Sequence, residues 1–324
     1  MSEIKFQPFK YLRLSLTDRC NFRCRYCLPE AQQEFHPLET SLRIGDWKKL
    51  LPLLRELGIR KVRLTGGEPT LHPALLEMVE MLTQSGFEET ALTTNGFRLE
   101  KLAPELKSRG LTRVNVHLDS LKEQGFDKAS QTQGLLGKVL SGIRLAQDLG
   151  LSPKVNVVLM RGENDGEAED FVRFSKREGI EVRFIELMPT GTNTDYFQEF
   201  FVPSMEIKRR LQERFQLEPL EKDPLGGPSR RFQVAGSRAR VGFIGASCEG
   251  FCDGCQRLRL TSEGVVKRCL FEPGGLELRP LLRSGAPDDE LKQALLSFLS
   301  QKWTFNPHVA GPVTEAFPLA RIGG

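Results

Sequence analysis

The sequence predicts an α/β fold in which a parallel sheet is covered by helices on its outer side. Two observations predict it. Short apolar strands alternate with longer helical patterns over the first two-thirds of the 324 residues, and a glycine follows each of five helical patterns, as C-terminal caps do. Six such units could form an open or incomplete barrel. The expected strands are 11–17, 60–65, 89–94, 112–118, 153–160 and 180–187, and the expected helices include 44–57, 73–85, 99–108, 135–149 and 167–178.

The pattern changes at DPLGGPSRR, residues 223–231, which is a turn-rich linker. Short strands are expected beyond it at 231–235, 238–244, 257–261 and 265–270, followed by one helix at about 288–300. We therefore divide the chain into a barrel region, 1–222, and a smaller C-terminal region, 223–324.

Composition narrows the class of protein. A hydrophobic content of 39% and a charged content of 27% are typical of a globular protein. The first residues contain no apolar signal segment, and no apolar run is long enough to span a bilayer, so we expect a cytoplasmic protein that does not bind membranes. The net charge of +4 is too small to indicate a nucleic-acid partner.

Apolar and polar side chains alternate along several expected strands. Leu12 and Leu14 share one face of the first strand, whereas Arg13 and Ser15 share the other. A parallel sheet covered on both faces would be apolar throughout, and an antiparallel sheet with one wet face is the alternative, which the intervening helices disfavour. We therefore expect a barrel with a cationic lumen. The cations expected to point into it are Arg13, Lys61, Arg63, Arg113 and Lys154. Because buried unpaired cations are costly, a polyanionic ligand is expected there.

The first cysteine group reads CNFRCRYC and places Cys20, Cys24 and Cys27 in a C-x3-C-x2-C pattern. Disulfides are not expected in a reducing compartment. Three thiolates can hold three irons of a four-iron cluster and leave the fourth iron open. A structural zinc site is the alternative, but zinc normally takes four ligands and no fourth one is near. The spacing therefore favours the iron–sulfur cluster.

Two motifs resemble those of radical S-adenosylmethionine (SAM) enzymes. They are LSLTDRCNFRCRYC, at the end of the first expected strand, and TGGEP at residues 65–69, at the end of the second. The resemblance implies that Tyr26 lies beside the adenine of SAM and that the backbone of Gly66 and Gly67 contacts its methionine amino group. Glycine permits such close backbone approach.

A second cysteine group, Cys252, Cys255 and Cys269, has the spacing C-x2-C-x13-C. Three ligands again suggest a cluster with an open iron, and a zinc ribbon lacking one ligand is the alternative. Arg257 and Arg259 lie two positions apart on an expected strand and share a face. Two arginines beside an open iron suit an anionic substrate.

Both groups together, with VRLTGGEPTL, KVNVVLMRGEND, RFIELMPTG and FCDGCQRLRLTSEG, resemble the GTP 3′,8-cyclase family over nearly the whole chain. This family performs the first step of molybdenum cofactor (molybdopterin) biosynthesis. The resemblance implies a partial (βα)6 TIM-like barrel, two [4Fe–4S] clusters and a homodimer. It also implies that a SAM-derived 5′-deoxyadenosyl radical takes hydrogen from C3′ of GTP, whose carbon radical then attacks C8. The product is (8S)-3′,8-cyclo-7,8-dihydroguanosine 5′-triphosphate.

The resemblance also implies roles for individual residues and partners. Cys20, Cys24 and Cys27 carry the catalytic cluster. The residues implied for SAM are Tyr26, Gly67, Thr94, Ser120 and Met188. Those implied for GTP are Arg13, Lys61, Arg63, Lys154, Arg183, Arg257 and Arg259. A terminal Gly323–Gly324 tail is expected to reach the active site. A reducing electron donor and a downstream cyclic pyranopterin monophosphate synthase are the implied partners.

Three residues depart from the family pattern. Cys248 creates a second C-x3-C-x2-C run. The family uses no cysteine there, so the resemblance implies that Cys248 is a spectator; as a ligand it would close the second cluster. His117 stands where the family usually has a serine near SAM, and a histidine can still donate a hydrogen bond. His72 stands where arginine is frequent, and we assign it no role.

Two other classes of protein would carry a similar first motif. One is a different radical enzyme with an auxiliary cluster, such as a peptide modifier. The other is a non-enzymatic iron–sulfur carrier or zinc scaffold. Neither accounts for Arg257 and Arg259 together with the cationic strand faces.

Overall fold

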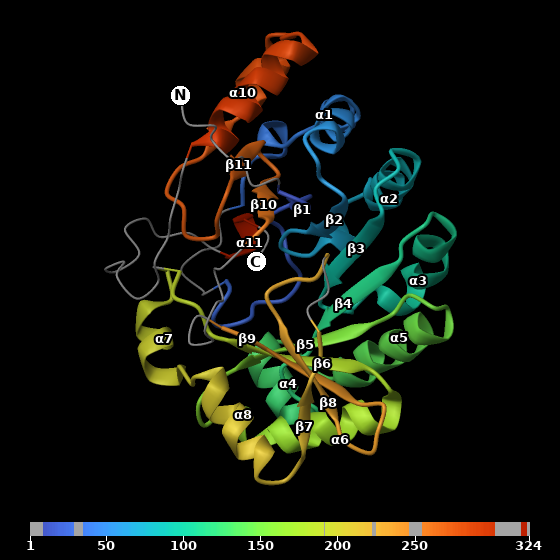
Figure 1. Cartoon of the computed structure of the whole chain (residues 1–324), viewed down its shortest axis with the longest axis vertical. Coiled ribbons are helices and arrows are strands. Elements are labelled where there is room, and N and C mark those ends of the chain that lie inside the picture. The colour runs from blue at the N-terminus through green and yellow to red at the C-terminus, as the bar shows by residue number, and fades with distance from the viewer. Residues whose placement is uncertain are drawn as a thin grey trace.

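The computed structural model describes residues 9–28, 35–190, 192–221, 225–245, 255–301 and 319–322. Twelve strands form one sheet in the order β12-β11-β10-β1-β2-β3-β4-β5-β6-β9-β8-β7 (Figure 1). The strands are β1 Tyr11–Ser15, β2 Lys61–Thr65, β3 Glu89–Thr94, β4 Arg113–His117, β5 Lys154–Leu159, β6 Glu181–Glu186, β7 Leu217–Pro219, β8 Arg230–Val234, β9 Arg240–Ile244, β10 Arg257–Leu260, β11 Val265–Lys267 and β12 Leu276–Glu277.

Strands β1 to β6 are parallel neighbours in chain order, which confirms the six predicted strands and their parallel pairing. Helices follow these strands and lie along the outside of the sheet, as Figure 1 shows for α1, α2, α3 and α5. The helices are α1 Ile44–Glu56, α2 Leu75–Gln84, α3 Leu99–Ser108, α4 Glu123–Ser130, α5 Leu136–Asp148, α6 Ala168–Glu178, α7 Thr194–Phe200, α8 Ser204–Gln212, α9 Arg279–Arg283, α10 Asp288–Ser300 and α11 Leu319–Ile322. None of the described helices is long and apolar enough to cross a membrane.

The apolar strand faces form the core between sheet and helices. Leu12 and Leu64 are fully buried, as are Leu50 and Leu54 of α1. Each such side chain stabilises the fold by about 1.5–3 kcal/mol when it leaves water. The alternation read from the sequence therefore places the apolar residues outward against the helices and the polar residues inward.

The segment beyond residue 222 extends both edges of the sheet. β10 pairs in parallel with β1, and β9 pairs in parallel with β6. Antiparallel neighbours complete each side, β11 and β12 beyond β10, and β8 and β7 beyond β9. β7 lies before the predicted boundary and pairs with β8 after it, so one meander spans that point. The division at residue 222 stays a prediction.

The sequence analysis missed α4, α7, α8, α9, α11, β7 and β12. Helix α8 is mostly polar, and only two of its buried residues, Ile207 and Leu211, are apolar, so its apolar signal is weak. Among the described strands, β7 and β12 each have a single neighbour and are the edges of the sheet. The barrel is therefore partial, as expected.

Candidate active site

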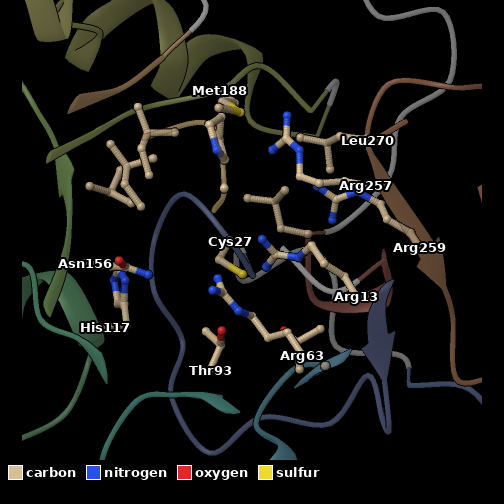
Figure 2. A pocket seen from close by; sticks show the side chains of 18 of the residues that line it. Arg13, Cys27, Arg63, Thr93, His117, Asn156, Met188, Arg257, Arg259 and Leu270 are labelled. Atoms are coloured by element: carbon tan, nitrogen blue, oxygen red, sulfur yellow. The ribbon is translucent and has the colours of Figure 1, made fainter. Parts of the chain in front are cut away.

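A cavity of about 630 Å³ lies against the inner face of the sheet. Its lining includes residues of β1 to β6, β9 and β10, so the sheet curves around it. Figure 2 shows side chains from these separate strands directed toward one space. The cavity contains most of the residues that the sequence analysis selected.

The three cysteines of the first group line this cavity. They lie on the loop after β1, and Cys27 N–H donates to the Cys24 carbonyl at 2.9 Å, which makes a tight turn. All three thiols are free and partly buried. Within the described ranges, no group of three His, Cys, Asp or Glu side chains is placed to hold a single metal ion. A four-iron cluster spaces its thiolates more widely, because each binds a different iron.

Gly66 and Gly67 pack against the cysteine loop itself. Gly67 N–H donates to Thr17 O at 2.7 Å, and Glu68 N–H donates to Arg19 O at 2.7 Å. A Cβ on Gly67 would lie 2.3 Å from Arg19 O. The glycine is therefore required by backbone contact with the loop that carries Cys20, in addition to any ligand contact.

A buried carboxylate supports the same loop. Glu68 accepts hydrogen bonds from Thr94 Oγ1 at 2.8 Å and from Asn95 N–H at 2.7 Å. Asn95 in turn donates to Asn21 Oδ1 at 2.9 Å, next to Cys20. Burial raises the pKa of Glu68, although these donors oppose the shift. Thr94 lines the cavity, but its hydroxyl proton is committed to Glu68.

The residues implied for SAM are only partly brought together. Tyr26, Gly67, Thr94 and Met188 line the cavity, whereas Ser120 does not. The Ser120 hydroxyl is buried and donates to Glu167 Oε1 at 2.8 Å.

His117 does line the cavity and joins Tyr26 to Asp119. Its Nε2 lies 2.6 Å from Asp119 Oδ2 and also bonds the Tyr26 hydroxyl. Burial lowers the pKa of His117, but Asp119 prevails and raises it overall. The imidazole is therefore held at the cavity wall by the tyrosine of the cysteine loop and by the end of β4.

Arginines form another part of the wall. The five arginines implied for GTP all line the cavity, and Arg268 adds a sixth that the sequence analysis missed. Burial and neighbouring arginines lower the pKa of Arg13 to about 9, and that of Arg259 to about 10. Crowded cations of this kind favour an anionic ligand.

The two predicted lysines lie elsewhere. The first residues of β2 to β6 form a layer of mixed charge, namely Lys61, Glu89, Arg113, Lys154 and Glu181. Lys61 Nζ lies 2.7 Å from Glu89, and Lys154 Nζ lies 2.9 Å from Glu181. Neither lysine lines the cavity, and Arg113, which was also expected to point into the lumen, does not line it either and lies near Glu89. The lumen is thus less uniformly cationic than expected, because Glu89 and Glu181 offset part of this charge.

Several buried polar atoms of the wall have no hydrogen-bond partner among the described residues. They are Tyr11 OH, Arg63 Nε, Thr93 Oγ1, Asn156 Oδ1 and Ser229 Oγ. Unsatisfied buried polar groups cost about 1–3 kcal/mol each. Their collection around one cavity fits a polar ligand.

The second cysteine group is described in part. Cys255 and Cys269 line the same cavity, whereas Cys252 and Cys248 lie outside the described residues. Arg257 Nε donates to Cys255 Sγ at 3.0 Å. Burial raises the pKa of the Cys255 thiol, but Arg257 outweighs burial and lowers it. A thiolate is the form that binds iron.

The Cys269 loop and the last described segment also meet this wall. Arg268 donates to Glu272 Oε1 at 2.7 Å and to Gln301 O, beyond α10, at 2.7 Å. Arg259 Nη1 donates to Ile322 O at 3.3 Å, which places α11 beside the arginines. Gly323 and Gly324 lie outside the described residues. The contacts of Arg268 with Gln301 and of Arg259 with Ile322 join segments far apart in the chain, so no local sequence signal reveals them.

Comparison with known families and structures agrees with this site. The model of the Radical SAM superfamily matches residues 14–175, and that of Molybdenum Cofactor Synthesis C matches residues 180–305. The GTP 3′,8-cyclase of Moorella thermoacetica is 40% identical over 98% of this chain and 98% of that protein. The corresponding protein of Thermodesulfovibrio yellowstonii is 39% identical over 97% of each chain.

Solved structures share the fold at low sequence identity. Streptococcus suis SuiB bound to S-adenosylmethionine has a TM-score of 0.59 at 15% identity, covering 90% of this chain and 68% of that one. SuiB bound to precursor peptide SuiA has a TM-score of 0.57 at 14% identity, covering 85% and 64%. The two likenesses confirm the partial-barrel fold class. With full-length relatives near 40% identity, the chain belongs to the GTP 3′,8-cyclase family of radical SAM enzymes.

Proposed function

We propose that this protein converts GTP to (8S)-3′,8-cyclo-7,8-dihydroguanosine 5′-triphosphate by radical SAM chemistry. The observation that carries the proposal is one cavity lined by Cys20, Cys24 and Cys27 and by six arginines. A cysteine loop alone would suit many radical enzymes. The arginines add the chemistry that a triphosphate needs.

The cysteines would hold two four-iron clusters. Cys20, Cys24 and Cys27 fit the first, because one loop brings three partly buried thiols to the cavity. Cys252, Cys255 and Cys269 would hold the second, and Arg257 supports this by favouring the Cys255 thiolate. When bound, the first cluster and SAM supply the radical that removes hydrogen from the substrate ribose.

The remaining roles belong to the protein. Tyr26, Gly67, Thr94 and Met188 would contact SAM from the cysteine side of the cavity. Ser120 would act from behind this wall, through Glu167, because it does not line the cavity.

The substrate would be held from the other side. Arg13, Arg63, Arg183, Arg257 and Arg259 would bind GTP directly, since each lines the cavity. Lys61 and Lys154 would act from the charged layer beneath the cavity. There Lys61 pairs with Glu89 and Lys154 pairs with Glu181.

The partners follow from this chemistry. The first cluster needs an external reducing electron donor, and a cyclic pyranopterin monophosphate synthase would take the product. We also propose a homodimer. Two clusters with exposed iron require a reducing compartment, so the proposed location is the cytoplasm.

An anaerobic assay tests the function. The protein is reconstituted with iron and sulfide, given dithionite, SAM and GTP, and analysed by mass spectrometry. We expect 5′-deoxyadenosine and the cyclised nucleotide together, and loss of both in Cys20→Ala. Deoxyadenosine formed without any nucleotide product would retain the radical class and reject GTP, as for a peptide modifier. Neither product, with both clusters intact, would reject the function.

A further inference from the structure

Asn156 is a polar residue of the cavity wall whose buried oxygen no other described residue engages. The Oδ1 atom is fully buried and has no hydrogen-bond partner in the described part of the chain. Two other buried asparagines nearby are satisfied. Asn115 donates to Leu92 O at 3.2 Å, and Asn164 donates to Val158 O at 2.7 Å and accepts from Met160 N–H at 2.7 Å. Asn156 is therefore not held by the scaffold as they are.

The sheet register places Asn156 between the two halves of the site. It pairs with His117 of β4 on one side and with Arg183 of β6 on the other. Figure 2 shows Asn156 beside His117 at the edge of the cavity. His117 bonds Tyr26 on the SAM side, and Arg183 belongs to the arginines on the substrate side.

The inner face of β5 changes character along its length. Lys154 lies in the charged layer, Asn156 follows at mid-height, and Val158 packs with the apolar cluster that contains Tyr26. Arg183 stands level with Asn156 on the neighbouring strand, so a nucleotide with its phosphates at the arginines would have its sugar near Asn156. Hydrogen transfer from the substrate sugar to the SAM-derived radical also requires both sugars to meet between the two halves.

A hydroxyl group fits this amide whichever way it is turned. The terminal torsion of asparagine is nearly two-fold, and a half-turn exchanges the acceptor oxygen for the donor NH2. A hydroxyl can donate to the oxygen or accept from the nitrogen. We propose that Asn156 is a specificity-determining residue that binds a hydroxyl of the substrate ribose. This inference rests on the proposed function, because it takes GTP as the ligand.

The inference predicts that loss of the Asn156 amide changes folding stability and ligand affinity in opposite directions. Replacing an unsatisfied buried amide by an apolar group of similar shape costs no protein hydrogen bond, so folding stability should stay equal or rise. Ligand binding should weaken by one hydrogen bond. A structural asparagine behaves differently, because its loss leaves backbone groups unpaired.

The test compares Asn156→Leu with the control Asn164→Leu in the reconstituted protein. We expect Asn156→Leu to keep or raise the thermal midpoint and to weaken GTP binding about 3- to 10-fold. One of the two analogues 2′-deoxyGTP and 3′-deoxyGTP lacks the contacted hydroxyl. For that analogue, the variant and the wild type should have the same affinity. Its SAM affinity should be unchanged. Asn164→Leu should lower the thermal midpoint clearly.

Several results would overturn the inference. If Asn156→Leu binds GTP as tightly as the wild type does, Asn156 makes no contact with GTP. Loss of SAM affinity with GTP binding intact would assign Asn156 to the SAM ribose instead. A fall in the thermal midpoint like that of Asn164→Leu would make it structural. If the wild-type protein binds no GTP, both this inference and the proposed function are rejected. If the wild type cyclises GTP and Asn156→Leu binds GTP equally well, only the inference is rejected.

Discussion

The two cysteine-bearing ends of the cavity provide opposite electrostatic surroundings. At the first end, burial raises the pKa of the Cys20 thiol to about 11 and that of Cys27 to about 12, with Cys20 adding to the shift of Cys27. At the second end, the cation of Arg257 overcomes burial and lowers the pKa of Cys255, whereas burial still raises that of Cys269 against the opposing Arg259 and Arg257. One end is apolar and enclosed, and the other is cationic.

This difference separates two tasks. A cluster in an apolar loop is shielded from water, which suits the generation of a reactive radical. A cluster flanked by arginines suits an anionic substrate that approaches its open iron. The comparison predicts that the two ends can be damaged independently.

The largest effect should come from the cysteines. Cys24→Ser should reduce SAM cleavage to background, because the first cluster loses a ligand. Cys255→Ser should still yield 5′-deoxyadenosine but no cyclised nucleotide, since only the substrate end is lost. Iron analysis should show a loss of up to about four irons per chain in each variant. Equal loss of SAM cleavage in both variants would show that the two ends are not separable.

A packing change should damage the first end alone. Gly67→Ala places a methyl 2.3 Å from Arg19 O, so the cysteine loop must move, at a cost of about 1–3 kcal/mol or more. We expect lower SAM cleavage and less iron at the first cluster, measured by electron paramagnetic resonance, with the second cluster retained. Gly137→Ala in α5 is the control. Its methyl meets nothing within 4 Å, and it should stabilise the protein by about 0.5–1 kcal/mol in thermal unfolding.

The sequence analysis correctly predicted which arginines face the cavity, but it overestimated the positive charge of the inner face. Strand alternation correctly turned Arg13 and Arg63 toward the cavity. The same alternation places Glu89 and Glu181, the first residues of β3 and β6, on that face, so their pairing with the lysines was open to prediction. The contact of Arg268 with the Phe298 carbonyl was not, because it depends on how the end of α10 meets the loop after β11.

The substrate end should respond to the shape of its cations. Arg259→Lys keeps the charge but loses the planar guanidinium, so the KM for GTP should rise about tenfold. SAM cleavage without GTP should not change. Arg173→Lys is the control, since Arg173 is exposed on α6 and pairs only with its own helix. An unchanged KM in Arg259→Lys would remove this arginine from the substrate site.

The smallest effect should be a dependence on pH. Burial and Arg183 lower the pKa of Lys154 to about 7, while Glu181 opposes the shift. Lys154 is thus a cation below pH 7 and loses its charge above it. GTP binding, measured by calorimetry, should weaken a few-fold as pH rises through 7, and Lys154→Met should remove this dependence. A variant that keeps the wild-type pH profile would show that another group titrates.

The pairing of β10 with β1 has a consequence for how the molecule is made. Tyr11 lies beside Arg257, although most of the chain separates them in sequence. The first six strands can associate in order during synthesis, but this pair forms only after the last third has emerged. Until then the edge of β1 and the cysteine loop behind it are uncovered. Iron delivered to the nascent chain would meet only half of its final surroundings, so assembly of the clusters is best timed after release from the ribosome.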